Sequence, residues 1–349
     1  RSGRRCSAGA MEGSVRAGSW APPQSPKEVV RASPKLNVPS APMRTVLFGM
    51  PRSGTTYGFS LLSEALKAQG PLTEVFEPNK LENNRFHRLD GMVWPDADAT
   101  LVKILYSSPE MHGWSGEAAA DAFAHFDKKI FLVRDPRDRW ISGFFYRWFY
   151  VHNPDPSAFE LAHKKVCQKE VNPSSVAFHR LHSDDPQVLK EHAEEQKRKL
   201  DELSAFLDRL RTDGWFIWHY EDLVDRNWDA VESYLGFSLK GEEALRGNFR
   251  HVARSQVHSD WRRWFTDADV EFYRPVFESY LKAQGYDASD WALSYPSELS
   301  PKQGSAYMHG LFHHPNGPHA VPVPWTQRAI QWARTQASLA LKAVGLKKR

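Results

Sequence analysis

The stretch Gly49-Met-Pro-Arg-Ser-Gly-Thr-Thr-Tyr57 has the outline of a phosphate-binding loop. The apolar run at residues 45–48 is typical of a buried strand, and residues 55–69 are predicted to form a helix that ends before Gly70 and Pro71. The loop is therefore expected between a strand and a helix N-terminus. Backbone N–H groups and the positive end of the helix dipole bind phosphate oxygens at such a place.

One residue of this loop limits the ligand. The spacing of Gly49 and Gly54 matches a Walker A motif, in which the next residue is a lysine that reaches the β- and γ-phosphates. Thr55 stands there instead, and its hydroxyl and that of Thr56 can donate further hydrogen bonds. We therefore expect a nucleotide with a single 5′-phosphoryl group and no metal. An ordinary turn rich in Gly and Ser is the alternative interpretation.

Composition places the chain among globular proteins. It has 349 residues, of which 41% are hydrophobic and 25% charged, enough for one large core or two modest ones. No stretch approaches the roughly 20 apolar residues that span a bilayer, so we expect a soluble, cytoplasmic protein. Cys6 and Cys167 lie far apart and indicate neither a disulfide scaffold nor a metal site. The formal charge of +4 is too small to predict nucleic-acid binding.

Three segments lie outside the predicted folded domain, residues 44–296. Residues 1–43, rich in Ser, Pro, Arg and Ala, are expected to be disordered, although an organelle transit peptide has a similar composition. Residues 297–324, rich in Pro and His, are expected to be an irregular connector. Residues 325–349 are predicted to form a basic amphipathic helix. It packs on its own domain or a partner, or lies on a membrane surface.

Apolar runs that resemble strands alternate with helical patterns from residue 44 onward. The expected strands are residues 45–50, 72–76, 101–106, 129–134 and 215–220, and helices follow the first, fourth and fifth. Residues 186–211 are predicted to form a highly charged helix with one apolar face. This alternation predicts an α/β, P-loop-like, three-layer fold with a central, mainly parallel sheet flanked by helices.

A second anion site is predicted beside the first. In Leu132-Val-Arg-Asp-Pro-Arg-Asp-Arg-Trp-Ile-Ser142, Arg134 ends a strand and Ser142 lies on the helix that begins near Pro136. An arginine guanidinium can bind two phosphate oxygens at once, and the serine can hydrogen-bond the same group. An ion pair of Arg134 with Asp135 or Asp138 is the alternative interpretation.

A third cationic segment lies near the end of the predicted domain. Arg254 precedes Asp260-Trp-Arg262 and Trp264, and a helix is expected to start at Thr266. Burial of the two tryptophan rings would hold the loop in place, so that Arg254 can close over a bound anion.

In their order, these segments resemble the sulfotransferases that use 3′-phosphoadenosine-5′-phosphosulfate (PAPS). Pro51-Arg-Ser-Gly-Thr-Thr56 resembles the 5′-phosphosulfate loop of that family, and Arg134 with Ser142 resembles its 3′-phosphate pair. Arg254 with Asp260-Trp-Arg262 resembles its C-terminal segment, and Tyr220-Glu-Asp-Leu223 its Tyr-Glu-Asp motif. The resemblance covers roughly residues 44–291.

The resemblance implies a function and a set of site residues. PAPS is the implied co-substrate and adenosine 3′,5′-bisphosphate (PAP) the product, without a metal, and a hydroxyl or amine of a small molecule or glycan is the implied acceptor. Adenine is implied to stack on Tyr57 or Tyr220. The residues implied to bind the donor are Arg52, Ser53, Gly54, Thr55, Thr56, Tyr57, Arg134, Ser142, Tyr220 and Arg254.

Several positions depart from the cytosolic members of that family. Arg52 and Tyr57 replace the lysine and tryptophan of the cytosolic Pro-Lys-Ser-Gly-Thr-Thr-Trp loop, which makes this loop more similar to tyrosylprotein, carbohydrate and many bacterial sulfotransferases. Ser255-Gln256 replaces a Lys-Gly pair after the C-terminal arginine. Asp267 occupies the valine position of the cytosolic dimer motif, so the oligomeric state stays open.

The resemblance also suggests catalytic residues. Sulfuryl transfer needs positioning, charge stabilisation on the leaving oxygen and a base for the acceptor. Arg52 is the candidate for the leaving oxygen, and Lys103 resembles a strand lysine that lies near the transferred sulfate. Glu77 has the position of the base in tyrosylprotein and carbohydrate enzymes. His112 and His87 are the reserve candidates for the base.

Two other functions are compatible with parts of this pattern. A protein of the same fold can bind PAP without transferring any group, as a sensor or scaffold. A P-loop kinase would need ATP and magnesium, and the missing lysine disfavours it. Phenols, alcohols, alkaloids, amines and sugars are all compatible acceptors.

Overall fold

The structure is a computed structural model that describes residues 42–77, 81–82, 85–86, 99–106, 115–150, 155–240, 252, 254–255 and 257–315. The expectations for residues 1–41 and for the helix at 325–349 lie outside the described residues. So do those for His87, His112 and Gln256.

A five-stranded parallel sheet forms the centre of the molecule, as predicted. Its order is β2-β5-β1-β6-β7, and every neighbouring pair is parallel. The strands are β1 (Arg44–Gly49), β2 (Leu72–Phe76), β5 (Ala99–Leu105), β6 (Lys128–Val133) and β7 (Phe216–His219). A separate antiparallel pair consists of β3 (Leu81–Glu82) and β4 (Arg85–Phe86).

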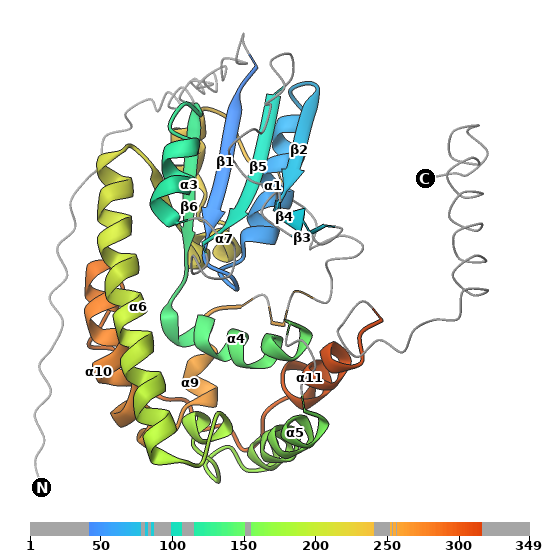
Figure 1. Ribbon diagram of the computed structural model, residues 1–349, viewed down its shortest axis with the longest axis vertical. Helices are drawn as coiled ribbons and strands as arrows, with labels where there is room; N and C mark the ends of the chain where they lie inside the picture. The colour runs from blue at the N-terminus through green and yellow to red at the C-terminus, as the bar shows by residue number, and fades with distance from the viewer. Residues whose placement is uncertain are drawn as a thin grey trace, which may run out of the picture. The chain divides into compact units, whose positions relative to one another are not determined.

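Helices occupy both faces of this sheet (Figure 1). The α-helices are α1 (Thr55–Lys67), α3 (Gly116–Ala122), α4 (Pro136–Tyr150), α5 (Pro156–Val171), α6 (Pro186–Thr212), α7 (Tyr220–Asp225), α8 (Asp229–Leu235), α9 (Trp261–Trp264), α10 (Asp267–Ala283) and α11 (Ser305–Phe312). Two short 3-10 helices are η1 (Phe178–Leu181) and η3 (Pro301–Gln303).

The three layers follow from the alternation of side chains along each strand. Val46 and Phe48 of β1 enter a core formed with residues of α3, α4, α6 and α10. Leu47, between them, enters a second core with residues of α1, α7 and α8. Because both faces of the sheet are buried, β1 and β6 are continuous apolar runs, which made them recognisable in the sequence.

Residues 297–324 were expected to be an irregular connector, and their described part instead contains η3 and α11. Met308, Leu311 and Phe312 recur at helical spacing and are buried in the first core. Pro301 begins η3, where a missing backbone N–H is tolerated. Pro301 therefore marks the start of the helical segment.

The topology places the ends of the strands together. The chain passes from β1 through α1 to β2, returns in β5, and then crosses β1 to reach β6. In open parallel sheets, ligands bind outside the carboxyl ends of the strands where the order changes direction. Helix α4 runs across this end of the sheet (Figure 1). The residues that follow β1, β2, β6 and β7 are those that the sequence analysis selected.

Candidate active site

The loop after β1 is shaped by its two glycines. A Cβ atom at Gly49 would lie 2.7 Å from the Leu132 carbonyl oxygen, so β6 can approach only a glycine. Gly54 caps α1 with a φ of 83°, and a Cβ there would lie 2.4 Å from the Tyr220 ring. The G-x-x-x-x-G spacing is therefore explained by a close approach at one end and a left-handed conformation at the other.

Arg52, inside this loop, also has a left-handed backbone, with a φ of 71°. Its Nε donates to Ser142 Oγ at 3.1 Å and its Nη2 to the Val252 carbonyl oxygen at 2.7 Å. The guanidinium carbon lies 3.8 Å from the centroid of the Tyr146 ring on α4. The side chain is thus fixed by groups 90 and 200 residues away in the sequence.

Arg134 follows β6 and lies against the same loop. Its Nη1 donates to the Arg52 carbonyl oxygen at 3.1 Å, and its Nη2 donates to the Val257 carbonyl oxygen at 3.3 Å. The guanidinium carbon lies 4.1 Å from the centroid of the Tyr220 ring. The Nε atom is buried and has no hydrogen-bond partner. The alternative was an ion pair of Arg134 with Asp135 or Asp138. Asp135 instead pairs with Arg137, and Asp138 accepts from two backbone N–H groups.

A cavity with about 590 Å³ of space, part of it open to solvent, joins these groups. Of the ten residues implied to bind the donor, all except Ser53 line it. The lining residues are Arg52, Gly54, Thr55, Thr56, Tyr57, Arg134, Ser142, Tyr220, Val224, Val252, Arg254 and Ser255. Ser53 is fully buried in the loop, and its Oγ has no hydrogen-bond partner.

Arg254 lines the cavity from the opposite end of the sequence but is already engaged. Its Nη2 pairs with Asp260, both side chains are almost fully buried, and its Nη1 donates to the Gln303 carbonyl oxygen at 3.1 Å. Its Nε is buried without a partner. This arginine is therefore held in place, and its Nε–H is left without a partner. Arg254 was expected to close over a bound anion, and in this structure its side chain is packed against Asp260 and Gln303.

Glu77 and Lys103 meet at the carboxyl ends of β2 and β5. Phe76 is paired with Lys103 in the sheet, and the Lys103 Nζ forms an ion pair with Glu77 Oε1. Only 1% of the lysine side chain and 17% of the glutamate side chain are exposed. Glu77 has a φ of 48°, a strained value for a residue with a Cβ. Such strain is often concentrated at functional positions.

The family assignment follows from a match along the sequence. A family model of the sulfotransferase domain matches residues 42–285. The chain belongs to the sulfotransferase family. A crystal structure of mouse sulfotransferase SULT7A1 complexed with PAP is similar, with 16% identity, a TM-score of 0.43, and coverage of 74% of this chain and 95% of that one. No curated protein matches the chain at a significant level.

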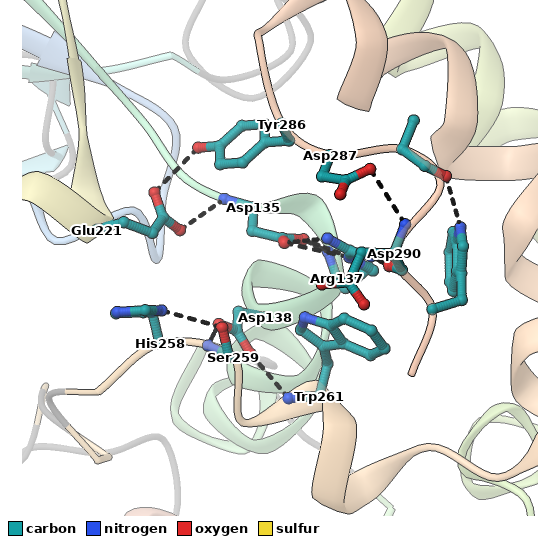
Figure 2. A network of polar contacts seen from close by, with 12 residues as sticks. Asp135, Arg137, Asp138, Glu221, His258, Ser259, Trp261, Tyr286, Asp287 and Asp290 are labelled. Carbon is teal, nitrogen blue, oxygen red and sulfur yellow. Dashed lines mark hydrogen bonds and ion pairs between the residues drawn. The ribbon is translucent and has the colours of Figure 1, made fainter. Parts of the chain in front are cut away.

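In this sulfotransferase a polar network joins the start of α4 to α7 and to the segment after α10 (Figure 2). Glu221 accepts hydrogen bonds from the Asp135 backbone N–H at 3.1 Å and from the Tyr286 hydroxyl at 3.1 Å. Arg137 pairs with Asp135 and donates to the Asp290 carbonyl oxygen at 2.6 Å. Burial raises the pKa of Glu221. The Tyr-Glu-Asp motif contains Glu221 of this network, and the segment 132–142 contains Asp135 and Arg137, but neither pattern indicated which groups pair.

Asp138 anchors the segment that leads from Arg254 to α9. It accepts hydrogen bonds from the backbone N–H groups of Ser259 at 2.5 Å and Trp261 at 2.9 Å (Figure 2). Burial raises the pKa of Asp138 to about 6, against the opposing effect of the nearby positive charge of Arg134. The start of α4 therefore follows Arg134 in the chain and also holds the segment that leads from Arg254 to α9.

Two searches of the described residues gave negative results. None of the described helices is long and apolar enough to cross a membrane. Within the same residues, no group of three or more His, Cys, Asp or Glu side chains is placed to hold a metal ion.

Proposed function

We propose that this sulfotransferase-family chain moves the sulfuryl group of PAPS to a hydroxyl or amine of a small-molecule or carbohydrate acceptor. The observation that carries the proposal is that nine of the ten residues expected to bind PAPS line one cavity, and that two of them, Arg134 and Arg254, each have a buried Nε without a partner. Buried polar atoms in folded proteins are nearly always hydrogen-bonded. Two arginines with an unpaired Nε in the lining of one cavity support an anionic ligand there.

The residues present fit a donor with two separate phosphates. The loop N–H groups, the start of α1 and the hydroxyls of Thr55 and Thr56 suit the 5′-phosphosulfate. Arg134 and Ser142 suit the 3′-phosphate. Tyr57 and Tyr220 border the same cavity and are the candidates to contact adenine. Because the Arg134 guanidinium stacks on the Tyr220 ring, this ring also helps to position the arginine.

In the proposed reaction, the acceptor oxygen forms a bond to sulfur while the bond from sulfur to the bridging phosphate oxygen breaks. PAP leaves with that electron pair, and Arg52 stabilises the charge on its 5′-phosphate. Glu77 takes the proton of the acceptor and later releases it to solvent. Once Glu77 is neutral, the Lys103 ammonium interacts with the sulfuryl oxygens. His112, outside the described residues, stays the alternative base.

Transfer of radiolabelled sulfate from PAPS tests the proposal. The protein is incubated with phenols, alcohols, amines and sugars in the presence of a magnesium chelator, and labelled product is expected. Binding of PAP by calorimetry without transfer to any acceptor would instead support a non-catalytic nucleotide-binding protein. Absence of PAP binding would contradict both functions.

The variant Arg134→Ala locates the 3′-phosphate. Loss of a charged hydrogen-bonding partner should weaken PAP binding by about 10- to 100-fold. The affinity for adenosine 5′-phosphate, which has no 3′-phosphate, should change little. Arg211→Ala, which removes an arginine on the exposed side of α6, is the matched control and should alter neither affinity.

A further inference from the structure

The segment that contains η3 and α11 lies beyond residue 285, where the family match ends, yet it is firmly built into the fold. Glu170 of α5 accepts hydrogen bonds from the backbone N–H of Ser305 at 2.5 Å and from its Oγ at 2.6 Å. A Cβ at Gly304 would lie 2.1 Å from the Glu170 carboxylate and 2.9 Å from the Trp264 ring, so the segment approaches α5 and α9 as closely as a glycine permits.

This segment contacts Arg254, which lines the cavity, and the Val252 carbonyl oxygen that accepts from Arg52. Gln303 accepts a hydrogen bond from Arg254 through its carbonyl oxygen, at 3.1 Å. The hydroxyl of Tyr307, on α11, donates to the Val252 carbonyl oxygen at 3.4 Å. The Arg52 Nη2 donates to that same carbonyl oxygen at 2.7 Å. Arg52 and Tyr307 therefore bind one shared carbonyl oxygen.

The chemistry of the tyrosine hydroxyl lets it interact with a carbonyl oxygen and with a neighbouring guanidinium. A tyrosine hydroxyl has one donor and two acceptor positions, so it can accept from a guanidinium while it donates to a carbonyl oxygen. Burial raises the pKa of Tyr307, which keeps the hydroxyl protonated at neutral pH. Arg52 has a strained backbone, and its guanidinium depends on side-chain and backbone partners for its direction.

We propose that Tyr307 is a positioning residue of the donor site, which directs the Arg52 guanidinium toward the 5′-phosphate of the nucleotide. The inference rests on the proposed function, because it assigns Tyr307 a part in that reaction. Helix α11 is then the third support of Arg52, after the Ser142 and Tyr146 side chains of α4. A part of the chain outside the family match thus sets the geometry of a residue inside the family's loop.

The variant Tyr307→Phe tests the inference, since it keeps the ring and removes the hydroxyl. Arg52 acts on charge that develops as the 5′-phosphate leaves, so kcat and the affinity for PAP should both fall by about tenfold. The KM for PAPS should change little, because the bridging oxygen carries less charge before transfer. The affinity for adenosine 3′-phosphate, which has no 5′-phosphate, should also be unchanged.

Two controls separate a positioning role from a structural one. Tyr295→Phe removes an exposed hydroxyl that donates to Asp267 at 3.0 Å, and it should alter none of these values. In an Arg52→Ala background, Tyr307→Phe should have no further effect on PAP binding, because the residue that it positions is gone.

Several outcomes would overturn the inference. Equal losses of affinity for PAP and adenosine 3′-phosphate would indicate a general structural effect, and unchanged kcat and PAP affinity would show that the hydroxyl has no role. If the wild-type protein binds PAP but transfers no label, the proposed function fails. The comparison of PAP with adenosine 3′-phosphate still tests Tyr307 in that case.

Discussion

Separate and combined substitution of Lys103 and Glu77 tests how far the ion pair between β2 and β5 stabilises the fold. Lys103→Met keeps a long apolar stem beside the Phe76 ring, whose centroid lies 4.2 Å from the ammonium nitrogen. Glu77→Gln keeps the shape of the carboxylate. Removal of one partner of a buried ion pair costs about 3–5 kcal/mol of unfolding free energy, because the other charge is left without compensation.

The burial of the two side chains predicts that the two single variants differ. In Glu77→Gln the remaining ammonium is 1% exposed, so we expect the full loss of unfolding free energy, about 3–5 kcal/mol. In Lys103→Met the remaining carboxylate is 17% exposed and keeps some water, so the loss should be smaller, about 1–3 kcal/mol. The double variant leaves neither charge and should be more stable than Glu77→Gln.

Urea unfolding of the four proteins, with a common m-value, measures these differences. The sum of the two single losses of unfolding free energy should exceed the loss in the double variant by about 1–3 kcal/mol. Losses that add to within about 0.5 kcal/mol would refute the reasoning, since the two charges would then be independent. Equal losses of unfolding free energy in the two single variants would refute the prediction that the more buried charge costs more when it is left alone.

The same variants test the base. A general base contributes about 10²- to 10⁴-fold to a rate, so Glu77→Gln should lose transfer by that factor while it keeps PAP binding. Because the double variant is expected to fold more stably, its loss of transfer cannot be attributed to unfolding. Full transfer activity in Glu77→Gln would remove Glu77 as the base and leave His112 as the candidate.

Two further predictions concern the loop and the pH dependence. Gly54→Ala forces a Cβ into the Tyr220 ring at a φ of 83°, so it should cost at least about 1–2 kcal/mol of unfolding free energy and weaken PAP binding, whereas Gly70→Ala meets no atom within 4 Å and serves as the control. Unchanged PAP affinity in Gly54→Ala would contradict this account. Burial and the nearby charge of Arg147 hold the pKa of His182 well below 6.5. The unfolded chain therefore binds the proton first, and urea unfolding should show stability falling by up to about 1.4 kcal/mol per pH unit below pH 6.5, less steeply in His182→Phe. An equal slope in that variant would argue against the assignment.

Local patterns carried much of the fold prediction. The expected strands at residues 45–50 and 129–134 agree with β1 and β6 to within one residue, because buried parallel strands are apolar on both faces. Most of the candidate residues for binding PAPS line one cavity for a related reason, since the loops after β1, β6 and β7 leave the carboxyl ends of parallel strands and the sheet brings those ends together. In both cases the decisive information lies within a few residues of sequence.

The supports of the site depend on distant partners, which no local pattern reveals. Asp138 accepts from Ser259 across 121 residues, and Arg137 donates to Asp290 across 153 residues. Nothing in the Arg-Asp-Pro-Arg-Asp sequence states which acid pairs with which arginine. The expectation that Arg254 closes over an anion was likewise based on the local sequence, without knowledge of its distant partners. Its pairing with Asp260 and contact with Gln303 become visible only when α9 and η3 are in place.

Backbone strain adds information that the residue types do not contain. Among the described residues, Arg52 and Glu77 are two of four non-glycine positions with a positive φ, and they are also the candidates for leaving-group stabilisation and for the base. A left-handed residue with a Cβ costs about 1–2 kcal/mol, so each must be held by its surroundings. Arg52 is held by Ser142, Val252 and the Tyr146 ring, and Glu77 by Lys103. Arg52 lines the cavity and Glu77 is paired with the buried Lys103, so the fold supplies contacts that hold both strained positions.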